Sequence, residues 1–259
     1  MTNQLLDRVA YLRDLLYELI IRDMKLRYKR SILGIIWSLI NPLAQLLVLQ
    51  FIFGFVLRLN IPNYASFMFV GLLVWSWFQS ALFSATSVII DNPDLIKRPG
   101  FPVAILPIVP VTTHLIHFLL AIPILLIFLL LGGFRLDESI LALPLVISVQ
   151  FLLTLSFSYI IATIHVSFRD TQYLLGIGLM LGFYLSPIFY ETNAIPKSLQ
   201  WVYRLNPMVD LIDMYRQILM QGRLPNLLPL CLIAGFSIVV LWSGYAVFTR
   251  ASYRFVEEI

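Results

Sequence analysis

Six long segments without a charged residue divide the chain. All 18 Lys and Arg residues and all 14 Asp and Glu residues fall outside these segments. A hydrocarbon core about 30 Å thick is crossed by about 20 helical residues, and a helix satisfies its own backbone hydrogen bonds in lipid. The pattern predicts an all-α integral membrane protein with six transmembrane helices. The predicted spans are Ser31–Leu57, Phe67–Ile90, Phe101–Phe134, Ser139–Phe168, Thr171–Tyr190 and Leu224–Thr249.

Prolines interrupt several of these spans. We expect a kink at each, because proline removes a backbone hydrogen bond that neighbouring helices in a membrane can replace. The residues are Pro42, Pro107, Pro110, Pro123, Pro144 and Pro187. The third segment is longer than one crossing needs, so we expect its first residues, Phe101–Pro107, at the membrane surface.

The N-terminal stretch Gln4–Arg30 has the pattern of an amphipathic helix. Its apolar residues recur at helical spacing, and its charged residues occupy the other faces. The apolar set is Leu5, Val9, Leu12, Leu16 and Leu19. Basic side chains on such a helix suit the anionic cytoplasmic leaflet. The helix is either a simple membrane anchor or one that also contacts a cytoplasmic partner, and its length favours the second reading.

Two of the connections also predict short helices. In Asp91–Gly100, Asn92 is placed to cap a helix that begins at Pro93, and this short helix across the membrane face has the form of a docking element rather than a simple loop. The connection Glu191–Arg223 is too long for a structureless turn. It predicts two amphipathic helices at the outer leaflet, one after Pro196 and one capped by Asn206–Pro207, which form a gate or a lid.

Composition and charge support a membrane protein with a defined orientation. Hydrophobic residues make up 60% of the chain and charged residues 12%, more apolar surface than a soluble domain of 259 residues can bury. The net charge of +4 does not indicate nucleic-acid binding, because the basic residues lie beside apolar segments. Lys and Arg are concentrated in the N-terminal stretch and in the second, fourth and C-terminal connections. The positive-inside rule then predicts that both termini are cytoplasmic.

The chain carries no sequence signature of an enzyme. It contains no GxxxxGK[ST] phosphate loop, no HExxH and only one cysteine, Cys231, so we expect no ATP hydrolysis and no cofactor or metal in this chain. The spans hold no carboxylates, which ion-coupled carriers use as relays. His114 and His117 lie one turn apart and form either a proton or metal site or, more simply, interhelical or pore-lining hydrogen bonds. The energy for uphill transport must therefore come from another polypeptide.

Aromatic side chains within the spans are candidates for the wall of a conduit. A neutral pore lined by aromatic rings suits sugars, whose apolar faces stack on the rings while their hydroxyls bond to polar groups. Packing or contact with lipid is the alternative for each ring. The candidates are Phe78, Phe83, Tyr159, Phe183 and Tyr184, whereas we expect the five tryptophans, Trp75 among them, at the membrane interfaces.

Several motifs together resemble the permease subunits of ABC-2-type polysaccharide exporters. They occur in the family's order along nearly the whole chain. They are Arg22–Gly34 with Trp37 and Asn41–Leu43, Asn92–Lys97, Phe101–Pro102, Ile105–Pro107, Phe168–Asp170, Ser186–Tyr190, Ile195–Pro196 and Leu205–Met208. The resemblance implies a homodimer of permeases in the bacterial inner membrane, with two ATP-binding subunits docked beneath it that hold ATP and Mg²⁺. The implied cargo is a lipid-linked glycan such as O-antigen, capsular polysaccharide or teichoic acid.

The resemblance also implies roles for particular residues. Residues 1–30 correspond to a gate helix, with Arg22, Lys25, Arg27, Tyr28, Lys29 and Arg30 at its end. The coupling helix within 91–100 contacts the ATPase through Asn92, Asp94, Leu95, Ile96, Lys97 and Arg98. Periplasmic gate helices within 191–223 include Ile195, Pro196, Trp201, Asn206, Pro207 and Tyr215. The transmembrane domain is 31–259.

Other functions remain open on the sequence alone. An ABC-2 exporter of a drug or a small lipid is one, and it needs only a lateral pocket rather than a continuous channel. A secondary carrier that uses the two histidines is another. A membrane-embedded transferase is a third, but no convincing cluster of catalytic groups supports it.

Overall fold

The computed structural model describes residues 2–29, 31, 33–57, 61–135, 137–192 and 195–258, and every regular element in these residues is helical. The longer helices are α1 (Thr2–Arg27), α2 (Trp37–Leu49), α3 (Tyr64–Ser87), α5 (Ile108–Leu131), α6 (Leu143–Ser167), α7 (Thr171–Tyr184), α9 (Pro207–Gln221) and α10 (Leu227–Ala251). The short ones are α4 (Pro93–Ile96), α8 (Gln200–Tyr203) and α11 (Phe255–Glu258). The 3-10 turns are η1 (Gly34–Ile36), η3 (Val103–Ile105), η4 (Glu138–Ala142) and η6 (Ser252–Arg254), and the π-helix η2 (Gln50–Val56) continues α2.

Five of the described helical segments are long and apolar enough to cross a membrane. They are Trp37–Val56, Tyr64–Ser87, Val103–Leu131, Glu138–Ser167 and Leu227–Glu258. The prediction of an all-α membrane protein is therefore confirmed. The predicted fifth span forms only the 14-residue α7 and then a series of turns, because Pro187 cannot donate the hydrogen bond that would continue the helix.

Helix α3 is the centre of the bundle. It contacts α2, α5, α6, α7 and α9, and most of its side chains are buried. Helices α6 and α10 pack along each other, and Gly244 permits the close approach, since a Cβ there would lie 3.0 Å from Ile160 Cγ1. Helices α2, α7 and α10 leave large apolar side chains uncovered. The bundle therefore packs closely around α3, and several of its outer helices present apolar surface to their surroundings.

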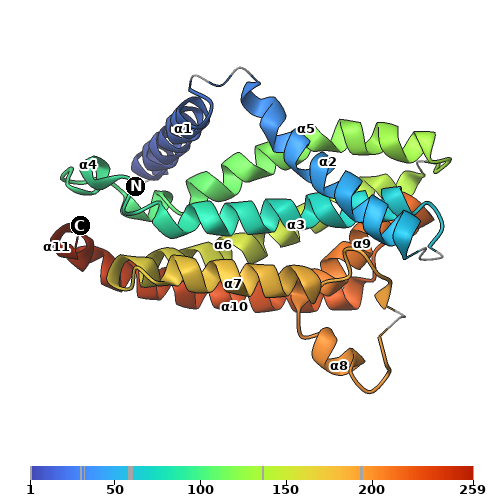
Figure 1. Ribbon diagram of the computed structural model, residues 1–259. Coiled ribbons are helices and arrows are strands. Elements are labelled where there is room, and N and C mark those ends of the chain that lie inside the picture. Colours follow the sequence, from blue (N-terminus) through green and yellow to red (C-terminus); the bar gives the residue numbers. More distant parts are fainter. Residues whose placement is uncertain are drawn as a thin grey trace.

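The two ends of the bundle carry different elements (Figure 1). Helices α4 and α11 and the first residues of α1 lie at one end, whereas α8 and α9 lie toward the other. Helix α1 is inclined to the bundle and packs against α5. Segments distant in sequence therefore meet at one end, where α11 also contacts α4.

The expectation of a kink at each proline was wrong for four of the six residues. Pro42 and Pro123 lie inside helices. Pro107, Pro110, Pro144 and Pro187 instead lie at helix starts or, in the last case, just after a helix end. The first turn of a helix has no partner for its N–H groups, so proline there costs no hydrogen bond.

Candidate functional site

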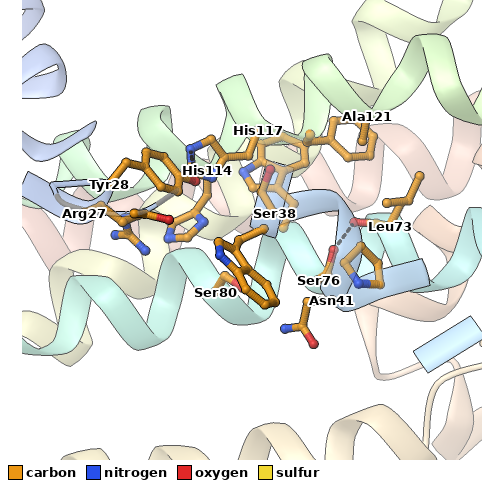
Figure 2. Close-up of a pocket in the computed structure, with 15 residues that line it drawn as sticks. Arg27, Tyr28, Ser38, Asn41, Leu73, Ser76, Ser80, His114, His117 and Ala121 are labelled. Carbon is orange, nitrogen blue, oxygen red and sulfur yellow. Dashed lines mark hydrogen bonds between the residues drawn. The ribbon is translucent and has the colours of Figure 1, made fainter. Parts of the chain in front are cut away.

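A polar cavity of about 360 Å³ lies where α1 meets α2, α3 and α5 (Figure 2). The end of α1 supplies Arg27 and Tyr28, and the other helices supply hydroxyl, amide, imidazole and indole groups. These are Ser38 and Asn41 from α2, Ser76, Trp77 and Ser80 from α3, and His114 and His117 from α5. The sequence singled out the two histidines but gave no sign that serines from α2 and α3 would line the same cavity.

The two histidines join helices through hydrogen bonds. The Nε2 atom of His117 lies 3.2 Å from the Tyr28 hydroxyl, and the Nε2 atom of His114 lies 3.0 Å from the Ser84 hydroxyl. Arg27 donates to the same Ser84 oxygen at 3.3 Å. Of the two readings, the geometry fits interhelical bonding, and the described residues contain no cluster of three metal-binding side chains.

The gate-helix residues divide between the cavity and the surface. Arg22 donates to the Asn92 side chain, Arg27 and Tyr28 line the cavity, and Lys25 and Lys29 are exposed. Arg30 lies outside the described residues. The Arg27 guanidinium is 3.6 Å from Asp23 in a half-exposed pair. Such pairs stabilise by less than about 1 kcal/mol, but this one offsets the positive charge at the cavity wall.

The inward face of α1 differs from the predicted one. Leu12, Leu16 and Leu19 pack against the core as expected, but Val9 is 65% exposed, and the Leu5 side chain lies outside the described part. The packed face also includes Leu15, Ile20 and Met24. The residues of α1 that pack against the core therefore lie closer to its C-terminal end than predicted.

The α4 segment forms as predicted, but its cap does not. Asn92 occupies the N-cap position with Pro93 next, yet its side chain accepts nothing from α4. Its Nδ2 donates instead to the Val88 carbonyl at 2.9 Å, and its Oδ1 accepts from Arg22. The amide thus bonds to the end of the preceding helix and to α1, and its oxygen is not directed to the N–H groups of α4.

The predicted ATPase-contact residues of α4 face two ways. Leu95 and Ile96 are buried within the chain, whereas Asp94, Lys97 and Arg98 are exposed. The two apolar side chains therefore anchor α4 to the bundle. The surface that α4 offers to another protein is charged.

The candidate conduit aromatics do not form one group. Phe78 lines an apolar cavity of about 700 Å³ together with Trp75. The Trp75 ring centroid is 5.6 Å from that of Phe78 and 6.3 Å from that of Phe183, which packs against Trp75. Tyr184 is 59% exposed and packs on Phe183. Trp75 is buried among the protein side chains, and its position at a membrane interface stays a prediction.

The remaining two candidates lie elsewhere. The Tyr159 hydroxyl donates to the Ala104 carbonyl at 2.7 Å, and its ring packs edge-on against Phe248. Phe83 lines a different cavity of about 350 Å³ with Gln172 and Tyr173. Spacing along separate helices did not reveal this division, because it depends on how the helices are rotated against one another.

The two helices predicted within 191–223 are present as α8 and α9, and their role as a gate stays a prediction. Asn206 caps α9 by accepting from the Met208 N–H at 3.1 Å, with Pro207 in the first position, as predicted. Trp201 is exposed on α8, and Tyr215 is fully buried. Ile195 lines the same apolar cavity as Trp75, and Pro196 accepts the backbone bond of Leu199.

The sequence reasoning missed the role of a buried arginine, Arg216. Its side chain is 4% exposed, with Nη2 donating to the carbonyls of Phe67 at 3.1 Å and Ile188 at 3.0 Å. The guanidinium carbon lies 3.4 Å from the centre of the Phe67 ring, and Asp213 is 3.9 Å from Nη1. Arg216 thus ties α9 to the start of α3 and to the turn after α7. The sequence did contain one signal of this burial, because Arg216 follows Ile212 by one turn and so lies on the apolar stripe of α9.

Burial shifts the pKa values of both members of this pair. Burial lowers the pKa of Arg216 to about 9, so the guanidinium remains charged at neutral pH. Burial likewise raises the pKa of Asp213, which accepts a hydrogen bond from Thr192 at 2.8 Å.

Gly71 makes room for this network, and its replacement provides a test. A Cβ at Gly71 would lie 3.0 Å from Arg216 Nη2 and 3.1 Å from the Ile188 Cα. We expect Gly71→Ala to lower the free energy of unfolding by about 1–3 kcal/mol through overpacking. Gly235→Ala, where the added methyl meets open space, is the control and should be neutral or slightly stabilising. Thermal unfolding of the purified protein measures both, and equal melting temperatures would contradict the close packing.

The chain matches the ABC-2 type transporter family over residues 14–220. It is 37% identical to the O-antigen export system permease protein RfbA of Myxococcus xanthus over 249 residues, which cover 95% of this chain and 96% of the relative. It is 36% identical to RfbA of Klebsiella pneumoniae over 251 residues, 96% of each chain. It is 28% identical to the polysialic acid transport protein KpsM of Escherichia coli over 244 residues, 93% of this chain and 92% of KpsM.

The helices and the matched region define an integral membrane component of an ATP-driven transporter. This chain belongs to the ABC-2 type transporter family. It is a multi-pass membrane subunit without catalytic function, and ATP is bound by a separate ATPase subunit in such systems.

Proposed function

We propose that this chain is the permease of an exporter that moves lipid-linked O-antigen out of the cytoplasm. The observation that carries the proposal is the similarity to two O-antigen export permeases along nearly the whole chain. The more distant similarity to a polysialic acid transport protein also points to a glycan rather than to a drug or small lipid. The large apolar cavity lined by Trp75, Phe78, Tyr190 and Tyr203 is consistent with the aromatic wall of a conduit.

The proposed architecture is a homodimer with two ATPase subunits beneath it in the inner membrane. Helix α7 provides the sixth crossing together with the turns that follow it, since Thr171–Tyr190 carries no charge. The uncovered apolar faces of α2 and α7 suit contact with a second copy or with lipid. Both termini are cytoplasmic, which the distribution of Lys and Arg supports. The end with α4 and α11 then faces the ATPase, and α8 and α9 face outward (Figure 1).

In the proposed mechanism, α4 transmits the ATPase movement to the spans. The exposed Asp94, Lys97 and Arg98 contact the ATPase through complementary charges. The buried Leu95 and Ile96 connect α4 rigidly to the rest of the chain, so displacement of α4 moves the bundle. Movement of α1 and of the α8–α9 region then opens the two ends of the conduit.

Reconstitution tests this function directly. The permease with its ATPase in vesicles should move lipid-linked O-antigen across the membrane only when ATP is supplied. The permease alone under a proton or sodium gradient should move none, because its spans hold no carboxylate relay. Uphill movement by the permease alone would support the carrier alternative instead, and transport of a drug but no glycan would support the small-molecule one.

A further inference from the structure

We propose that the polar cavity beneath α1 binds a neutral sugar ring of the lipid-linked glycan. The proposal rests on the proposed export function and adds a specific recognition site to it. The cavity of about 360 Å³ is at the small end of the range of about 300–1,000 Å³ for ligand pockets, a size for one or two rings.

The lining has the chemistry that recognises a hydroxyl-rich ring. Ser31, Ser76 and Ser80 contribute hydroxyls, and Asn41 contributes an amide, groups that both donate and accept hydrogen bonds. Trp37, Trp77, Tyr28 and Phe118 contribute aromatic surface, against which the C–H face of a pyranose can pack. The polar groups lie across the cavity from one another, with Arg27 and Tyr28 on one side and Ser76 and Asn41 on the other (Figure 2).

The charge of the lining favours a neutral ring over a phosphate group. Arg27 is the one Lys or Arg among the described residues of the wall, and its guanidinium already lies 3.6 Å from Asp23 and donates to Ser84. A diphosphate carries more than one negative charge, which a single, partly neutralised guanidinium does not balance. A lipid chain is disfavoured as well, because it would form no hydrogen bond with the Ser80 hydroxyl or the Asn41 amide.

The cavity wall also connects recognition to the movement of α1. Tyr28 belongs to the segment at the end of α1, and its hydroxyl contacts His117 of α5 at 3.2 Å. A ring that occupies the cavity contacts the α1 segment and the spans at once. The site therefore binds the sugar while α1 is in its position over the cavity, and the exporter selects its glycan at this site.

Binding of methyl glycosides tests the site. The whole permease–ATPase complex in lipid nanodiscs is titrated with the methyl glycosides of glucose, galactose, mannose and N-acetylglucosamine, and saturation-transfer NMR measures binding. At least one glycoside should bind saturably. Ser76→Leu and Ser80→Leu, which fill the cavity, should each weaken that binding by about tenfold or more, equivalent to about 1.4 kcal/mol.

The matched control is Ser243→Leu. Ser243 and Ser76 both donate to the carbonyl three residues earlier at 2.9 Å, but Ser243 is exposed on α10 away from the cavity. Its replacement should leave binding unchanged. The proposal would be overturned if no glycoside bound saturably to the unaltered complex. It would also be overturned if the two cavity variants bound the glycoside as tightly as the unaltered complex does. The proposal would also fail if inorganic diphosphate bound, no glycoside bound, and the two cavity variants weakened the diphosphate binding. The cavity would then be a phosphate site.

The outcome is separable from that of the proposed function. Glycoside binding with no ATP-driven glycan export would retain the site and reject the export function. Glycan export with no glycoside binding would retain the function and reject the site.

Discussion

Replacing Arg216 with alanine should lower the free energy of unfolding by about 3–5 kcal/mol, the cost of removing one partner from a buried charge network. The change leaves the Ile188 carbonyl and the Asp213 carboxylate without the guanidinium and removes the cation from the Phe67 ring. Three segments, α9, the start of α3 and the turn after α7, then lose their common contact. Denaturant unfolding of the purified permease measures the loss.

Matched variants identify the cause of this loss of stability. Arg223→Ala removes an exposed arginine just after the same helix and should change stability by no more than about 0.5 kcal/mol. Arg216→Lys keeps the charge but cannot reach both carbonyls with a planar fork, so we expect an intermediate loss. Arg216→Met with Asp213→Asn removes the charges together and should recover part of the stability. A fully stable Arg216→Ala protein would show that the network contributes nothing.

Reversing the charge of α4 should have the largest effect on transport. The double variant Lys97→Glu and Arg98→Glu changes two exposed side chains on the surface that we assign to the ATPase. We expect ATP-driven export to fall by more than about tenfold, because like charges across an interface cost several kcal/mol. Insertion and melting temperature should remain unchanged. Export in vesicles and co-purification of the ATPase are the two measurements.

Two further variants locate this effect. Lys197→Glu with Arg223→Glu makes the same charge change beyond α7, in the region of α8 and α9, and should leave ATPase binding intact. Leu95→Asp, in contrast, buries a carboxylate in the packing beneath α4, so we expect a loss of stability as well as of export. Normal export in the α4 double variant would remove α4 from the coupling path.

The sequence by itself determined the membrane character and the order of the helices. The absence of charge over long segments requires lipid or protein on every side, and this property depends on composition along the chain alone. The local signals at Asn206 and Pro207 were likewise sufficient to predict α9, because a cap depends on residues within one turn. The α4 segment was predicted for the same reason, although the tertiary contacts with Arg22 and Val88 redirected the Asn92 side chain.

Only the tertiary structure decided which side chains meet. The sequence grouped Phe78, Tyr159 and Phe83 as one aromatic set, and the rotation of their helices places them at three separate locations. The cavity beneath α1 combines residues from four segments, and Arg216 bonds carbonyls 149 and 28 residues away in the chain. Such contacts depend on how neighbouring helices are rotated and how closely they approach. A uniformly apolar span has no periodic pattern that specifies either of these.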